Sequence, residues 1–220
     1  METQVVRTHV MLLERRELSH GCFVLRLERG DLRFEPGQYV ILGAPGWRDR
    51  REYSVYSGPD DPFLELLVKE IPEGLVSRKL HALDPGDTLE VEGPLGYFTI
   101  PSEARADGRF LFVATGTGIA PFHCFARAYP QLDYHLLHGV RHATERHEHE
   151  SYPPERYTAC VTGEPGGDYR GRVTHYLQRC ELHPDTLCYL CGNCDMIFEA
   201  FDILQRRGVA PEHLHAEVYF

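Results

Sequence analysis

The chain has 220 residues and a formal net charge of −10, so it is long enough for one large domain or two small ones with real cores. The negative balance disfavours a nucleic-acid partner, and no apolar run approaches membrane-spanning length. The start, Met1-Glu2-Thr3-Gln4, lacks the basic and apolar regions of a signal peptide, and the seven cysteines are not spaced like a secreted disulfide scaffold. We therefore expect reduced thiols and a cytoplasmic protein.

The first hundred residues predict an all-β domain. Short β-rich segments recur and are divided by turn clusters such as Glu35-Pro36-Gly37 and Asp84-Pro85-Gly86-Asp87. The segments are Val10–Leu13, Cys22–Leu27, Gln38–Leu42, Glu52–Tyr56, Phe63–Lys69 and Thr88–Glu92. This spacing is typical of a small antiparallel barrel or sandwich, interrupted here by one helix-like stretch at Val76–Leu83.

After Pro101 the pattern changes to alternating strands and helices. The expected strands are Phe110–Ala114, Tyr134–Val140, Tyr157–Val161 and Leu187–Cys191, and the expected helices are Ala120–Ala128, Val173–Cys180 and Asp195–Arg207. Strands that alternate with helices indicate a parallel α/β sheet. The polar link near Pro101–Gly108 places the boundary between a domain of residues 1–103 and one of residues 104–220.

A glycine loop follows the first strand of the second half. The apolar run before it ends at Thr115, and Gly116-Thr117-Gly118 leads into helix-compatible residues. Glycines let the backbone approach an anion, and a helix start supplies N–H groups and a positive dipole end, so the loop predicts a phosphate site. Pro121 stands where the usual dinucleotide fingerprint has a third glycine, and a plain tight turn is the alternative.

Two further segments in the first half have the chemistry to meet a phosphate. In Arg51-Glu52-Tyr53-Ser54 an arginine can contact a phosphate with two prongs, and the tyrosine two residues later can stack on an aromatic ring. Gly74 and Ser77 open the only helix-like stretch, where free N–H groups and a hydroxyl again suit an anion. The alternatives are a surface arginine with a barrel tyrosine and an ordinary helix cap.

Five motifs in chain order resemble the ferredoxin–NADP reductase family. They are Arg51-x-Tyr53-Ser54, Gly74-x-x-Ser77, Gly116-Thr117-Gly118-Ile119-Ala120-Pro121, Cys191-Gly192 and Glu217-Val218-Tyr219. Each is weak alone, but five in order over nearly the whole chain are specific. The resemblance implies an antiparallel FAD-binding barrel followed by an NAD(P)-binding α/β domain, which agrees with the two halves expected above.

The resemblance also implies a role for each matching residue. Arg51 would contact the FAD diphosphate, Tyr53 would stack on the isoalloxazine ring and Ser54 would hydrogen-bond near flavin N5. The backbone around Val68 would meet the flavin or ribose, and Gly74 to Ser77 would cradle the diphosphate. The remaining residues would serve the nicotinamide dinucleotide: the loop of Thr115, Gly116, Thr117, Gly118 and Pro121 would bind it, and Cys191, Gly192 and Glu217 would lie near the nicotinamide.

The last two residues are aromatic, and this departs from family members that end on the tyrosine of Glu-Val-Tyr. The extra Phe220 looks like the bacterial subclass, which implies Tyr219 on the isoalloxazine and Phe220 on the adenine of a folded FAD. The implied catalytic set is then Ser54, Cys191, Glu217 and Tyr219.

The choice between NADP and NAD depends on charges after the second strand of the α/β domain. An acid there favours the free 2′-hydroxyl of NAD, whereas an arginine accommodates the 2′-phosphate of NADP. Arg141 follows that strand, and Arg172 resembles another 2′-phosphate arginine of the bacterial enzymes. Gly163 stands where NADP-specific members have arginine, so NADP is favoured and NAD remains possible.

The cysteines and histidines carry weaker signals. Cys188-x-x-Cys191-x-x-Cys194 has a spacing seen in iron–sulfur ligation, but an offset of three along a strand points Cys188 and Cys191 to opposite faces. A redox-active pair of Cys191 and Cys194 stays open as an alternative. His138 lies near the second strand end without a firm role, and we expect no metal site.

The resemblance implies electron transfer between NADPH and a one-electron carrier, ferredoxin or flavodoxin, through FAD. Arginines before the flavin strand and near the domain joint could form a positive face for such an acidic partner; they are Arg48, Arg50, Arg51, Arg105 and Arg109. A flavin reductase, or the reductase subunit of a multicomponent oxygenase, is the alternative within enzymes. A nucleotide-sensing or assembly subunit is the alternative outside them. The sequence leaves the oligomeric state open.

Overall fold

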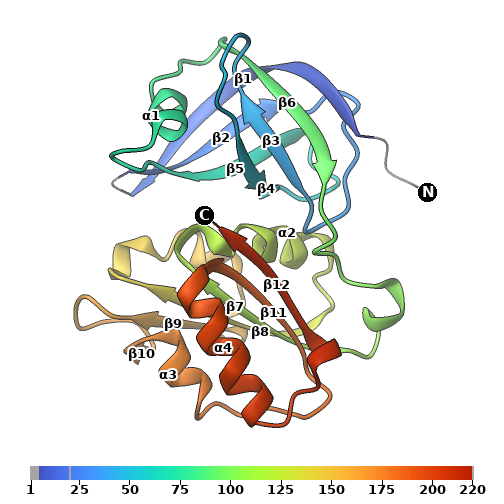
Figure 1. Ribbon diagram of the computed structural model, residues 1–220, viewed down its shortest axis with the longest axis vertical. Coiled ribbons are helices and arrows are strands. Elements are labelled where there is room, and N and C mark those ends of the chain that lie inside the picture. Colours follow the sequence, from blue (N-terminus) through green and yellow to red (C-terminus); the bar gives the residue numbers. More distant parts are fainter. Residues whose placement is uncertain (1–4, 20, 220) are drawn as a thin grey trace. The chain divides into compact units, whose positions relative to one another are not determined.

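The computed structural model describes residues 5–19 and 21–219, and its chain divides into two compact units (Figure 1). The first unit contains residues 1–99 and 123–128, and the second contains residues 100–122 and 129–220. Within the described residues, none of the helices combines the length and the apolar character needed to cross a bilayer.

The first unit is a six-stranded antiparallel sheet that curls into a nearly closed barrel. Its strands are β1 (Val6–Ser19), β2 (Cys22–Glu28), β3 (Tyr39–Gly43), β4 (Arg51–Ser54), β5 (Phe63–Lys69) and β6 (Thr88–Leu95), in the order β4-β3-β6-β1-β2-β5. An antiparallel bridge between Val55, directly after β4, and Leu66 on β5 joins the two edge strands. The predicted antiparallel barrel is therefore confirmed.

Strand β1 is longer than the sequence pattern predicts, because it pairs with two neighbouring strands. Its first half pairs with β6, from Val6 to Met11, and its second half pairs with β2, from Leu12 to Ser19. The second half carries the charged run Glu14-Arg15-Arg16-Glu17, which masks the alternation expected of a strand. Helix α1 (Leu75–His81) is the only α-helix inside residues 1–99 that the structure describes.

The second unit is a six-stranded parallel sheet with helices. Its strands are β7 (Arg109–Thr115), β8 (Asp133–Val140), β9 (Tyr157–Val161), β10 (Tyr169–Arg170), β11 (Leu187–Asn193) and β12 (Leu214–Tyr219), in the order β10-β9-β8-β7-β11-β12. Its helices are α2 (Ala120–Ala128), whose residues from His123 on belong to the first unit, α3 (Val173–Leu177) and α4 (Cys194–Arg206). The predicted parallel α/β domain is confirmed.

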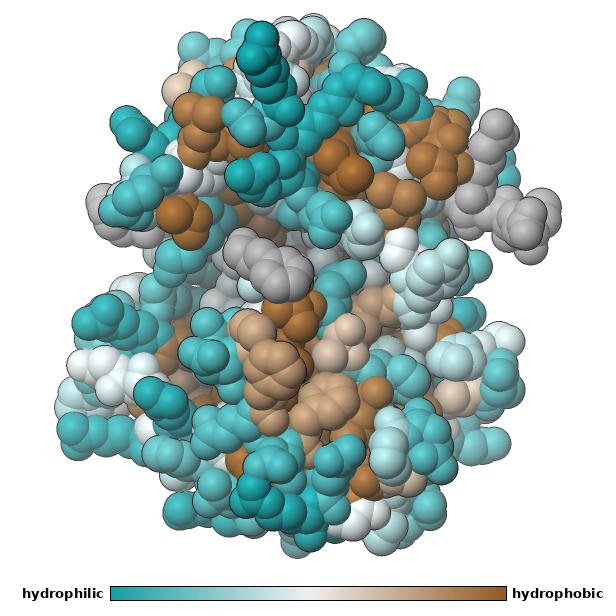
Figure 2. Space-filling view, in the orientation of Figure 1, coloured by the Kyte–Doolittle hydropathy of each residue, from teal (hydrophilic) through white to brown (hydrophobic). Residues whose placement is uncertain are grey.

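Side chains that alternate along the central strands pack an aliphatic core on one face of this sheet and aromatic rings on the other. Leu111 and Val113 on β7 pack in an aliphatic core with residues of α3 and α4, and Figure 1 shows these two helices on one face of the sheet. Phe112 instead stacks on Phe122, with ring centroids 4.9 Å apart, and packs edge-on against Tyr189. Figure 2 shows that apolar side chains also reach the surface over α4 and β12.

Candidate functional site

Strand β7 is the point where the order of the parallel sheet reverses. The next strand in the chain, β8, lies on one side of β7, and β11 lies on the other. In open α/β sheets such a reversal leaves a crevice beyond the carboxyl ends of the strands, and ligands bind there. The loop after Thr115 and the turn at Gly192 lie at these two strand ends, so the structure brings these two predicted motifs together.

The two motifs are packed backbone against backbone, which only glycines allow. A Cβ atom at Gly118 would lie 2.4 Å from the carbonyl oxygen of Cys191 and 2.6 Å from Cα of Gly192. Gly192 has a φ of +123°, and a Cβ there would lie 2.5 Å from Oγ1 of Thr115. The Thr115 hydroxyl also accepts a hydrogen bond of 2.9 Å from the backbone N–H of Asn193, which ties the ends of β7 and β11 together.

The outer side of the loop is open. Gly116 has a φ of +52°, and apart from its chain neighbours no described residue has an atom within 4 Å of the position that its Cβ would occupy. Residues Gly116–Ile119 form a 3-10 turn that runs directly into α2, and Pro121 lies in the first turn of that helix. The first N–H groups of such a turn have no acceptor within it, so this loop can offer them to an anion.

A second helix begins at the same edge of the sheet. Helix α4 follows β11 directly, and the Asn193 side chain caps it by accepting a hydrogen bond of 3.1 Å from the N–H of Met196. The positive dipole ends of α2 and α4 therefore both lie where β7 and β11 end. Sequence reasoning missed Asn193, although an asparagine between a strand and an apolar helical pattern is a recognisable cap signal.

The last strand brings three more predicted residues to this edge. Cys191 pairs in register with Glu217, and Asn193 pairs with Tyr219. The Cys191 thiol is buried, and burial together with the nearby Glu217 carboxylate raises its pKa well above the usual range, opposed by a hydrogen bond from the Tyr219 side chain. Cys191 is therefore an uncharged thiol, and this argues against a thiolate ligand or nucleophile there. Phe220 lies outside the described residues.

The ends of β8 and β9 carry both signs of charge. Arg141 follows β8, and Arg172 occupies the position before α3, after the glycine-rich loop. Sequence reasoning gave no weight to two carboxylates here. Glu145 accepts hydrogen bonds from the N–H groups of Arg141 (2.8 Å) and His142 (3.0 Å), and Glu164 accepts one of 2.7 Å from Ala143. These acids oppose the arginines at the position where a 2′-phosphate is expected.

In the barrel, Arg51, Tyr53 and Ser54 lie on strand β4, paired with β3. Arg51 is exposed, with one guanidinium nitrogen donating 2.7 Å to the Arg50 carbonyl oxygen, whereas Ser54 is buried. Tyr53 packs against the barrel core, and burial raises its pKa to about 12. Val68 lies on edge strand β5 with its side chain buried, so only its backbone can serve a ligand.

Gly74 and Ser77 lie at the start of α1. The Ser77 hydroxyl accepts a hydrogen bond of 3.0 Å from the N–H of Ile71, which orders the preceding turn. A Cβ at Gly74 would lie 2.8 Å from Cβ of Ile71, so the turn requires glycine. The first turn of α1, Leu75-Val76-Ser77, carries no acidic side chain. Its backbone N–H groups and the Arg51 guanidinium are hydrogen-bond donors that fit the negative diphosphate of FAD.

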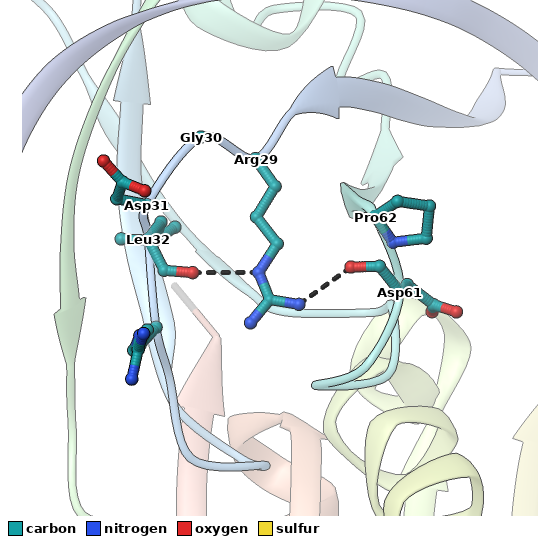
Figure 3. Close-up of a pocket in the computed structure, with 7 residues that line it drawn as sticks. Arg29, Gly30, Asp31, Leu32, Asp61 and Pro62 are labelled. Atoms are coloured by element: carbon teal, nitrogen blue, oxygen red, sulfur yellow. Dashed lines mark hydrogen bonds between the residues drawn. The ribbon is translucent and has the colours of Figure 1, made fainter.

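A separate polar pocket of about 250 Å³ lies in the barrel unit (Figure 3). Its central residue is Arg29, whose guanidinium donates to the carbonyl oxygens of Leu32 (2.9 Å), Asp61 (2.8 Å) and Pro59. Asp61 in turn accepts from Arg127 at 2.7 Å. Because backbone carbonyl oxygens of both loops occupy the guanidinium, Arg29 connects the two loops and we assign no ligand to this pocket.

The expected positive face is weaker than the sequence indicates. Arg50 forms ion pairs with Glu90 and with Glu92, and Arg109 lies 3.8 Å from Asp133. Arg105 uses two guanidinium nitrogens on the Ile100 carbonyl oxygen, at 2.9 Å and 2.7 Å. Arg48, Arg51 and Arg109 are the exposed members of the set, and of these only Arg48 and Arg51 lie in the first unit.

A nearly closed antiparallel barrel followed by a parallel α/β unit with a glycine loop at its switch point defines a class of two-domain oxidoreductases. Residues 9–100 match the family model of the oxidoreductase FAD-binding domain, and residues 112–200 match that of the oxidoreductase NAD-binding domain. The chain belongs to the ferredoxin reductase family, and its cofactors are FAD and a nicotinamide dinucleotide.

Similar proteins include two kinds of reductase. The chain is 32% identical over 205 residues to the reductase subunit of an Amycolatopsis aromatic O-demethylase, covering 86% of this chain and 61% of that protein. It is 28% identical over 207 residues to the flavodoxin/ferredoxin–NADP reductase of Escherichia coli, covering 81% and 82%. The chain therefore spans less than two thirds of the O-demethylase subunit.

Among solved structures, the fold superposes with a TM-score of 0.87 on a ferredoxin NADP+ reductase from Neisseria gonorrhoeae with bound FAD and NADP. The alignment covers 97% of this chain and 99% of that chain at 23% identity, which supports the shared fold.

Proposed function

We propose that this protein transfers electrons between NADPH and a one-electron carrier, ferredoxin or flavodoxin, through FAD. The observation that carries the proposal is the close packing of Gly118 against Gly192 at the switch point, beside the open outer side of the loop at Gly116. The match of residues 9–100 to the oxidoreductase FAD-binding domain supports FAD as the group between the two electron carriers. Hydride acceptance and single-electron release are the chemistry that FAD supplies when bound.

The residues of the barrel unit would hold and orient the flavin. Arg51 and the N–H groups from Gly74 to Ser77 would neutralise the diphosphate, and Tyr53 and Ser54 would meet the ring system. The backbone of Val68 would border the flavin, and Phe220, which belongs to the second unit, would cover the adenine. We divide the chain into an FAD domain of residues 1–103 and a dinucleotide domain of residues 104–220, because β6 ends at Leu95 and β7 begins at Arg109.

The residues of the α/β unit would bind and orient the dinucleotide. The loop of Thr115, Gly116, Thr117, Gly118 and Pro121 would hold its diphosphate, with Gly192 opposite, and Arg141 and Arg172 would attract the 2′-phosphate. Cys191 would lie beside the nicotinamide as a neutral thiol, with Glu217 as the nearby acid. Tyr219 would move aside when the nicotinamide approaches. The seven cysteines are free thiols, which supports a cytoplasmic protein.

A visible absorption spectrum of the purified protein, before and after NADPH, tests the proposal. We expect a yellow protein that bleaches within seconds under anaerobic conditions. Arg51→Ala should lower the flavin content, and Arg48→Ala, an exposed arginine three residues earlier, should not. Protein that stays colourless with excess FAD would refute the proposal. A yellow protein that NADPH and NADH both leave oxidised would instead favour a sensing or assembly subunit.

A second candidate is the reductase subunit of a multicomponent oxygenase, or a flavin reductase. The similarity to the O-demethylase reductase subunit favours it. Reduction of a separate ferredoxin that weakens as salt is raised would support the first candidate, because docking of an acidic carrier is electrostatic. Efficient reduction of free flavin with no reduction of ferredoxin or flavodoxin would support the flavin reductase.

A further inference from the structure

A histidine is buried directly beneath the glycine loop. His138 lies on β8 and is fully buried, with Nε2 at 2.9 Å from the carbonyl oxygen of Gly116. Its other ring nitrogen, Nδ1, lies 2.9 Å from the hydroxyl of Tyr157 on the neighbouring strand β9. The ring therefore links the loop to the interior of the sheet through two hydrogen bonds.

The partners of the ring determine its protonation state. A carbonyl oxygen only accepts, so Nε2 carries the proton that is donated to Gly116. Burial lowers the pKa of His138 to about 4, so the ring is neutral near pH 7 and Nδ1 has a free lone pair. The Tyr157 hydroxyl consequently donates to Nδ1, and the two hydrogen bonds run in one direction from Tyr157 to Gly116.

Tyr157 is itself held in place. It is buried and stacks on Tyr152, with ring centroids 5.4 Å apart and planes 13° from parallel. A hydroxyl fixed in this way favours one orientation of the imidazole, whose tautomer is set by the Gly116 carbonyl oxygen. The loop is therefore held from below by an ordered chain of two rings.

The contact with the carbonyl determines where the loop presents its donors. In a trans peptide the C=O and the following N–H point in opposite directions. Since the Gly116 carbonyl points inward to His138, the N–H of Thr117 points away from the sheet, to the open side of the loop. Without the imidazole donor, the buried carbonyl would lose its partner, and a flip of this peptide toward solvent would turn the N–H inward.

We propose that His138 is a positioning residue that holds the Gly116–Thr117 peptide in the orientation that binds the diphosphate of the nicotinamide dinucleotide, with Tyr157 fixing the orientation of its ring. The inference rests on the proposed function of the loop. His138 acts through the backbone and takes no part in the chemistry of hydride transfer.

The test compares three variants of the full-length holoprotein with the parent. His138→Leu removes the donor, and His138→Gln places an amide N–H at the distance of Nε2. The matched control is His135→Gln, because His135 lies on the same strand and bonds a β9 hydroxyl, Thr158, at 2.8 Å without reaching the loop. Calorimetry gives the Kd of NADP+, and steady-state ferricyanide reduction gives kcat and KM for NADPH.

We expect His138→Leu to raise Kd and KM about tenfold, while kcat at saturating NADPH stays within about twofold of the parent. His138→Gln should recover most of the affinity, and His135→Gln should bind as the parent does. Parental Kd in His138→Leu, or an equal loss in His135→Gln, would overturn the inference.

A nitrogen-15 NMR spectrum of the histidine rings supplies a readout that is independent of activity. The parent should show His138 as the neutral Nε2–H tautomer, and a bare Nε2 would overturn the inference. If His138→Leu does not fold, Tyr157→Phe replaces it, with an expected threefold or so rise in Kd; parental Kd there would count against the inference. A folded parent that binds neither NADP+ nor NAD+ would reject the proposed function and this inference together, whereas parental binding that His138→Leu leaves intact rejects only the inference.

Discussion

Substitution of Gly118 by alanine tests whether the close packing at the switch point positions the dinucleotide loop. The added Cβ would lie 2.4 Å from the carbonyl oxygen of Cys191 and 2.6 Å from Cα of Gly192. Ordinary contacts begin at 3.4 Å, and both neighbours are backbone atoms of β11, so the loop must move by about 1 Å. We expect such overpacking to destabilise the second unit by about 1–3 kcal/mol.

A shift of this size should also reach the nucleotide. Displacement of a binding group by about 1 Å can lower catalytic efficiency by as much as about 100-fold. We therefore expect Gly118→Ala to lower kcat/KM for NADPH by about 10- to 100-fold in ferricyanide reduction. The flavin content should stay at the parental value, because the substitution lies in the second unit.

Gly208→Ala is the matched control. Gly208 has a φ of +91°, and apart from its chain neighbours no described residue has an atom within 4 Å of its Cβ position, so alanine there is strained by about 1–2 kcal/mol without a collision. Both variants should melt at lower temperature, but only Gly118→Ala should lose kcat/KM. If Gly118→Ala keeps parental efficiency, or if Gly208→Ala loses as much, the packing at the switch point does not position the loop.

Three further predictions follow from other parts of the chain. His81 contacts Glu70 and Glu17, and its hydrogen bond to Glu70 raises its pKa above 6.5; its stabilising contribution is complete below pH 6.5 and is lost as pH rises through the folded pKa. Urea midpoints of the parent should therefore fall over that range, and those of His81→Gln should fall less; parallel curves would refute the role. Glu164→Gln removes a negative charge near the expected 2′-phosphate and should raise the ratio of kcat/KM for NADPH to kcat/KM for NADH severalfold. An unchanged ratio would contradict this prediction. Cys194→Ser should leave ferricyanide reduction unchanged, because the buried Cys191 stays a neutral thiol; a large loss would favour a redox-active pair.

The fold could be predicted from the sequence because its signals are local. Short β-rich segments and turn clusters predicted a small barrel or sandwich, and alternating strands and helices predicted a parallel sheet. The helix predicted at Ala120–Ala128 has these same bounds in the structure. The charged second half of β1 has no clear alternation, and its strand state depends on pairing with β2. Strand β12 was not predicted, because among the described residues it pairs in register only with β11, which is distant in the sequence.

The candidate site could be predicted only as separate motifs. The sequence identified Gly118 and Gly192 as neighbours of a ligand. It did not show that the absence of a side chain at each glycine lets the two backbone segments pack together. His138 looked like a histidine near a strand end, and its role depends on Gly116 and Tyr157, which no local pattern connects to it. Likewise, Glu145 and Glu164 are held near the arginines by hydrogen bonds that they accept from backbone N–H groups, and no local pattern predicts these bonds.

The side chains buried at the switch point share one property that explains how the site can favour a nucleotide in an acidic protein. His138 is neutral because burial lowers its pKa to about 4, and Cys191 is neutral because burial raises its pKa. Because Cys191 is a neutral thiol, it adds no negative charge that would repel a diphosphate from the N-terminal ends of α2 and α4, which lie where β7 and β11 end. In this low-dielectric setting a diphosphate is attracted by oriented backbone groups, although the chain as a whole carries a net charge of −10. The neutral Cys191 thiol, and the hydrogen bond between neutral His138 and the Gly116 carbonyl oxygen, are thus as much a part of the site as the glycines that shape it.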